Sequence, residues 1–125
     1  MKLKITAVRD IRNIDSERVV MEATEDCDLG DYILFDTTYT EKGGVSNEWR
    51  HIFIFPNKKV KKGEIVRVYT KKGSTGEIPA KGDTPHHYNF YWNLEKSIWN
   101  DNGDCAHLYE IKEKGKPFIV PKATK

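Results

Sequence analysis

Apolar and polar residues alternate with a period of two along much of this chain, which is the pattern of half-buried β-strands. The alternation is clearest in 49–55, where Trp49, His51, Phe53 and Phe55 fall on one side. No stretch of about 12 residues carries a helical stripe with capping residues at its ends. Further segments rich in β-branched and aromatic residues complete about eight predicted strands: 3–8, 18–24, 32–38, 64–70, 87–92, 105–111 and 117–120.

Short turn signals separate these strands. Lys62-Gly63 and Lys114-Gly115 each precede a strand, and Asn102-Gly103 has the residue types of a tight hairpin turn. The segments 39–48 and 71–86 are long and rich in Gly and Thr, and we predict them to be loops. Many short strands joined by Gly and Pro turns predict an all-β fold, a sandwich or a barrel.

The composition supports a single folded domain. The chain has 125 residues, of which 38% are apolar, and it carries five Phe, six Tyr and three Trp. This length is typical of one domain, and the aromatic content argues against disorder. We predict one domain over 1–125, with a core from about 3 to 120 and a short end at 121–125. In the first strand, Leu3, Ile5 and Ala7 alternate and are expected to lie on one face.

Charge is nearly balanced overall but uneven along the chain. The formal net charge is +2; segment 10–36 is strongly acidic, whereas segment 50–72 is strongly basic. This predicts an acidic side and a basic side. Basic loops can contact phosphate groups, so nucleic-acid binding is one hypothesis. The basic loops 58–62 and 71–72 flank strand 64–70 and would lie roughly 20 Å apart. The candidate contacts are Lys58, Lys59, Lys61, Lys62, Lys71 and Lys72.

The second half of the chain resembles a known family. The run FIFPNKKVKKGEIVRVYT reads as strand, turn and strand, and the segment SIWNDNGD then precedes a short apolar strand. This order is similar to the lamin-tail domain, in its bacterial stand-alone form. The resemblance implies an immunoglobulin-like β-sandwich of about seven to nine strands, a non-catalytic role, and contacts with proteins, DNA or chromatin. Its signature residues are Phe55, Pro56, Gly63, Trp92, Trp99, Asn100, Gly103 and Asp104.

Candidate chemistry elsewhere has a structural explanation in each case. Trp99 is interpreted as a core residue, and segment 100–104 as a turn rather than a calcium loop. Adjacent histidines on a strand point to opposite faces, so His86 and His87 do not suggest one metal site. Two cysteines far apart in sequence are expected to stay as thiols in a reducing compartment. No catalytic motif is found, and no cofactor or metal is predicted.

These observations predict a non-catalytic binding module whose partner is a protein. Edge strands of a sandwich invite strand addition by a partner or by a second copy of the chain. Nucleic-acid binding through 58–62 and 71–72 is the alternative. The sequence contains no secretory signal and no apolar run of about 20 residues, so we expect a cytoplasmic protein without a membrane segment.

Overall fold

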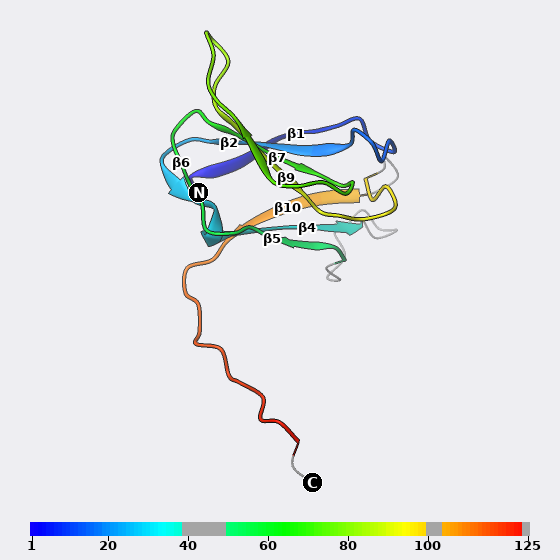
Figure 1. Ribbon diagram of the computed structural model, residues 1–125, viewed down its shortest axis with the longest axis vertical. Coiled ribbons are helices and arrows are strands. Elements are labelled where there is room, and N and C mark those ends of the chain that lie inside the picture. The colour runs from blue at the N-terminus through cyan, green and yellow to red at the C-terminus, as the bar shows by residue number, and fades with distance from the viewer. Residues whose placement is uncertain (39–49, 100–103, 124–125) are drawn as a thin grey trace.

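The computed structural model describes residues 1–38, 50–99 and 104–123, and their regular structure is almost entirely β-strand (Figure 1). This confirms the predicted all-β class. A single turn of 3-10 helix, η1 (Leu29–Asp31), leads into β4. The strands are β1 (Leu3–Arg9), β2 (Arg18–Ala23), β3 (Cys27–Asp28), β4 (Tyr32–Thr38), β5 (Ile52–Ile54), β6 (Lys59–Val60), β7 (Ile65–Tyr69), β8 (Gly76–Ile78), β9 (His87–Tyr91) and β10 (Asp104–Glu110).

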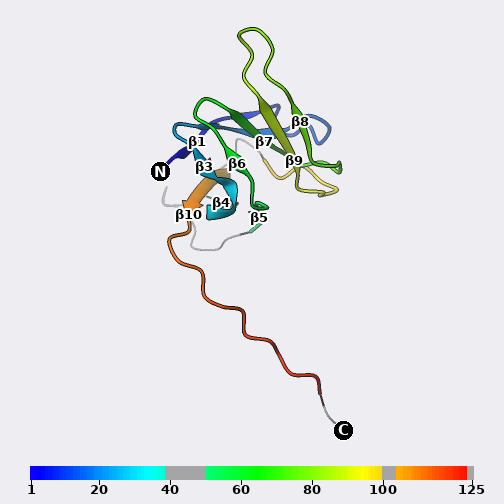
Figure 2. The same cartoon turned by 60° about the vertical axis from the view of Figure 1, so that its left-hand side comes forward.

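The strands form two larger sheets and one small one. The five-stranded sheet has the order β1-β2-β7-β9-β8, the three-stranded sheet has the order β10-β4-β5, and β3 pairs with β6. Neighbouring strands are antiparallel except β7 and β9, which are parallel. The two larger sheets lie face to face, and the connection between β8 and β9 (79–86) projects beyond them (Figures 1 and 2).

The core lies between the two larger sheets. Val66 and Val68 of β7 are fully buried, as the alternation in 64–70 requires. Aromatic rings bridge the two layers: the ring of Phe53 on β5 lies 6.1 Å from that of Phe90 on β9 and 5.7 Å from that of Trp92. Because these rings meet edge to face, they add a directional contact to the burial of their apolar surface.

A β-bulge in β1 changes the face that its second half buries. The pairing of β1 with β2 shifts register between Ile5 and Ala7. Ile5 and Val8 therefore pack against the core, and the expectation that Ala7 shares the face of Leu3 and Ile5 is wrong. A bulge inserts one extra residue, so the period-two pattern changes phase at that point.

The predicted strand at 117–120 is absent. The chain from 111 to 123, here called the C-terminal extension, has no regular structure and runs away from both sheets (Figures 1 and 2). The apolar, β-branched composition of 117–120 favours an extended backbone, but a strand also needs a neighbour with free backbone groups. In the described structure no such neighbour lies beside this segment.

Three short strands were not predicted from the sequence. β8 lies inside 71–86, which was predicted to be a loop, and β3 and β6 each contain only two residues. Runs of two or three residues are too short to show a period, so only their backbone partners define them as strands. The segment predicted at 49–55 contains β5, and residue 49 lies outside the described residues.

Candidate functional site

The outer edge of β5 is the most unusual surface in the described structure. β5 is the last strand of the three-stranded sheet, and in the described part of the chain no strand pairs with its other side. Ile52 is 47% exposed and Ile54 is 74% exposed, whereas Phe53 between them packs against the core. The strand therefore presents two large apolar side chains to solvent at an open sheet edge. We call this surface the β5 edge.

The backbone groups of the β5 edge also point outward. The Asp36 N–H donates to the His51 carbonyl at 3.2 Å, so this opposed pair is of the hydrogen-bonded type. Pairs alternate along an antiparallel ladder, so Leu34 and Phe53 form the next such pair. The N–H and C=O groups of Ile52 and Ile54 consequently face away from β4, ready to pair with another strand.

Other sheet edges are protected in ways that the β5 edge is not. β1 carries the bulge, with exposed Lys4 and Arg9 along it. β8 is as short as β5, but it is followed directly by Pro79, which has no backbone N–H. β10 begins and ends with acidic residues. Charge, bulges and proline are among the usual devices that prevent edge-to-edge association.

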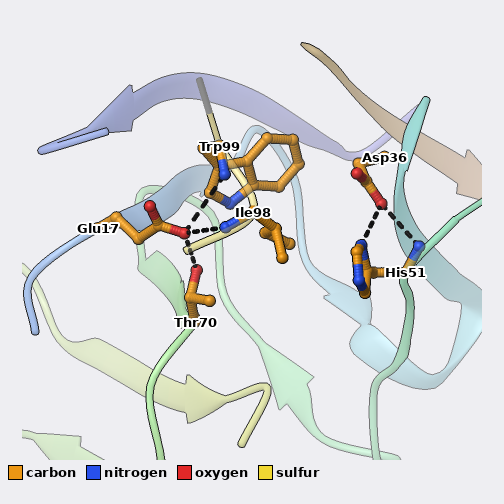
Figure 3. A network of polar contacts seen from close by, with 6 residues as sticks. All are labelled: Glu17, Asp36, His51, Thr70, Ile98 and Trp99. Carbon is orange, nitrogen blue, oxygen red and sulfur yellow. Dashed lines mark hydrogen bonds and ion pairs between the residues drawn. The ribbon is translucent and has the colours of Figure 1, made fainter. Parts of the chain in front are cut away.

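A buried carboxylate fixes the start of β5. Asp36 on β4 is 1% exposed, and its Oδ1 accepts hydrogen bonds from the His51 backbone N–H at 2.7 Å and from His51 Nδ1 at 3.1 Å (Figure 3). An open cavity of about 490 Å³ beside this pair is also lined by Ser97 and Lys96. The Ser97 hydroxyl donates to Glu17 Oε1 rather than to the histidine. The pair thus positions the backbone that leads into the β5 edge.

Glu17 anchors the wall of that cavity. Its fully buried carboxylate accepts hydrogen bonds from Thr70 Oγ1 at 2.6 Å and from the Ile98 and Trp99 backbone N–H groups at 3.0 and 3.4 Å (Figure 3). Arg12 N–H donates to its other oxygen at 3.1 Å. One side chain therefore joins the turn before β2, the end of β7 and the segment that precedes β10. The acidic composition of segment 10–36 gave no sign that two of its carboxylates, those of Glu17 and Asp36, are buried.

The six candidate lysines do not form one surface. Four of them lie before β7 and two lie after it, at opposite ends of that strand (Figure 1). Lys58 Nζ is 3.5 Å from Glu77 and 5.5 Å from the centre of the Tyr88 ring, and Lys72 Nζ is 3.1 Å from Glu95. These contacts offset part of the positive charge that a phosphate backbone would meet.

The acidic and basic segments also meet each other, contrary to the prediction of two separate sides. β3 of the acidic segment pairs with β6 of the basic segment, with Asp28 opposite Lys59. Asp26 Oδ1 accepts the Lys62 backbone N–H at 2.9 Å, and Asp28 Oδ1 accepts that of Lys58 at 3.1 Å. Opposite charges are thus interleaved around the small sheet, because strand pairing brings together segments that are distant in sequence.

The residues of the predicted family signature have different environments. Phe55 and Trp99 are buried in the core, and Trp92 packs against it. Pro56 is exposed, and Gly63 has φ of 88°, which a glycine adopts without strain. Asp104 begins β10, whereas Asn100 and Gly103 lie outside the described residues. The core interpretation of Trp99 is therefore confirmed.

Perturbed ionisable groups lie away from the β5 edge. Burial, reinforced by a hydrogen bond to Glu110, raises the pKa of Tyr32 to about 12, and burial with a hydrogen bond to Glu64 does the same for Tyr88. Burial also raises the pKa of the Cys27 thiol and lowers that of His87. A hydrogen bond from His86 lowers the pKa of Glu77. These shifts follow from local burial and pairing, and they do not converge on one site.

Within the described residues, no group of three or more His, Cys, Asp or Glu side chains is placed to bind a metal ion, and no helix is long and apolar enough to span a membrane. Both cysteines are unpaired in the structure.

No protein-family model matches the sequence, and no curated protein matches it at a significant level. The lamin-tail resemblance thus stays a prediction, and the class that the structure supports is an all-β protein with an open apolar edge.

Proposed function

We propose that this chain is a non-catalytic interaction module that binds a protein by accepting an extended strand at the β5 edge. The observation that carries the proposal is the exposure of Ile52 and Ile54 on a strand whose outward backbone groups have no neighbouring strand in the described structure. Strand addition uses both features at once: backbone hydrogen bonds supply affinity, and the alternating side chains supply specificity.

The immunoglobulin-like β-sandwich of the lamin-tail family is the fold we propose for this module. Two facing sheets, the core positions of Phe55 and Trp99, and the left-handed backbone at Gly63 support it. Nucleic-acid binding is the weaker alternative. Lys58 Nζ lies 3.5 Å from Glu77 and Lys72 Nζ lies 3.1 Å from Glu95, and the lysines of 58–62 and of 71–72 lie at opposite ends of β7.

Selection from a library of random linear peptides tests the proposal. The immobilised protein is the full chain with Phe118, Ile119 and Val120 each replaced by Ser, so that exposed apolar residues of the C-terminal extension do not capture peptides themselves. We expect enrichment of short runs of β-branched and aromatic residues.

Two variants show where the selected peptides bind. Ile54→Pro removes an outward N–H without removing a bond to β4, and it should abolish binding. Ile78→Lys on the β8 edge is the matched control and should bind normally. Peptides that bind the Ile54→Pro protein as tightly as its parent would contradict the proposal.

A further inference from the structure

The C-terminal extension carries an apolar segment that is almost fully exposed. Phe118, Ile119 and Val120 are 87%, 86% and 81% exposed, and they lie between Pro117 and Pro121. Three consecutive large apolar side chains in water are unusual in a monomer, and exposed apolar groups of this kind mark interaction sites. Their β-branched and aromatic character favours an extended strand when a partner edge is available.

The base of the extension is held in a fixed direction. The Ile111 N–H donates to the Asp31 carbonyl at 2.6 Å, and Lys114 Nζ donates to the Gly30 carbonyl at 2.5 Å. Beyond Lys114 the chain runs outward, away from both larger sheets (Figures 1 and 2). The apolar segment is therefore presented to another molecule rather than to the sheets of its own chain.

We propose that segment 118–120 of one copy adds as an antiparallel strand to the β5 edge of a second copy, and that the exchange is reciprocal. This inference rests on the proposed function, because it requires that the β5 edge accepts a strand. It goes further by naming the occupant. A reciprocal exchange between two identical chains closes on itself with two-fold symmetry.

The register follows from the outward groups of β5. Ile52 and Ile54 must each face a residue that has a backbone N–H, so Phe118 lies opposite Ile54 and Val120 opposite Ile52. Directly opposed residues share a sheet face, so the exposed apolar side chains of both segments cover each other. Ile119 then lies opposite Phe53, on the side that faces the core. β5 and the added segment have the same length of three residues.

The two prolines fit this register. Successive residues of a strand direct their N–H groups to opposite sides, so the nitrogens of Pro117 and Pro121 face away from β5, where the ladder needs no donor. The same prolines remove donors from the new outer edge of the sheet, which hinders a further strand from adding there. The assembly is thus expected to stop at a pair of chains rather than grow into a fibre.

Sedimentation equilibrium of the full chain over a range of concentrations tests the proposal. We expect the parent protein to shift from monomer to dimer as concentration rises. Replacing Phe118, Ile119 and Val120 by Ser should leave a monomer, and so should Ile54→Pro. Ile54→Lys provides a second edge variant in case the proline disturbs folding, which circular dichroism monitors. Ile78→Lys should dimerise like the parent.

A mixing experiment makes the test specific. The Ile54→Pro chain keeps its apolar segment but has a blocked edge, whereas the triple Ser variant keeps its edge but lacks the segment. Each should be monomeric alone, and the mixture should form a heterodimer through a single exchange. A heterodimer in this mixture is difficult to explain by any interface other than the one proposed.

Three results would overturn the proposal. One is a parent protein that stays monomeric at every concentration. Another is a dimer that persists in the triple Ser variant. The third is a monomer in which the Ile52 and Ile54 amides exchange slowly with deuterium in the parent but quickly in the triple Ser variant. That result would mean that the extension covers the β5 edge of its own chain. If the dimer fails but selected peptides still bind the β5 edge, the proposed function survives without this inference.

Discussion

Replacing the buried carboxylate of Glu17 should lower the unfolding free energy by an amount that follows from its hydrogen bonds. Replacing it by Gln keeps the shape of the side chain but converts one acceptor oxygen into an NH₂ donor. In the better orientation the amide oxygen faces Thr70, Ile98 and Trp99, and the NH₂ group faces Ser97 and the Arg12 N–H. The Ser97 hydroxyl is able to rotate and accept, but the Arg12 N–H then faces another donor.

The expected loss is about 3 kcal/mol of unfolding free energy. Each of the three remaining bonds changes from a charged to a neutral acceptor, which costs about 0.5–1 kcal/mol per bond, and the lost bond adds about 1 kcal/mol. A domain of this size has a total stability of about 5–15 kcal/mol, so the variant should fold but with a much smaller margin.

Urea unfolding followed by tryptophan fluorescence measures this loss. With a slope of about 1–3 kcal/mol per molar urea, the Glu17→Gln midpoint should fall by roughly 1–3 M at an unchanged slope. Glu25→Gln is the matched control, since Glu25 is exposed, and its midpoint should stay close to that of the parent. A Glu17→Gln midpoint within experimental error of the parent would show that the Glu17 carboxylate does not hold these segments together.

Further predictions follow from other parts of the molecule. A Cβ added at Gly30 would lie 1.9 Å from Oδ1 of the exposed Asn57 side chain, which can rotate away, and 3.2 Å from Asn57 Cα, so Gly30→Ala should lower the unfolding free energy by only about 1 kcal/mol, and equal stability in the same urea assay would refute the clash. Burial and Arg67 lower the pKa of His87 below 6.5, so the unfolded chain binds the proton more readily. Stability should therefore fall as pH drops below 6.5 and level off below the folded pKa, and His87→Gln should flatten this dependence. If nucleic acid is a partner, changing the four lysines of 58–62 to Gln should weaken duplex binding and reduce its salt dependence, whereas unchanged binding would reject that site.

Strand content was largely predictable from this sequence, because burial of one face imposes a period of two on the side chains. The alternation in 49–55 predicted that Phe53 and Phe55 share one side of a strand, and in the structure that side packs against the core while Ile52 and Ile54 are exposed. The apolar composition of 117–120 was informative in the same way, since it identified a strand-forming segment. It did not reveal whether a partner strand exists.

The sequence by itself determined which segments favour an extended backbone and which side of each strand is apolar, since both depend on neighbouring residues. Only the tertiary structure decided the order of strands in each sheet, and hence that β5 lies at an edge. It also decided that Glu17, among many acids, is buried against donors from three distant segments. Hydrogen bonds between strands and contacts with a buried carboxylate join residues far apart in the chain, so no local pattern records them.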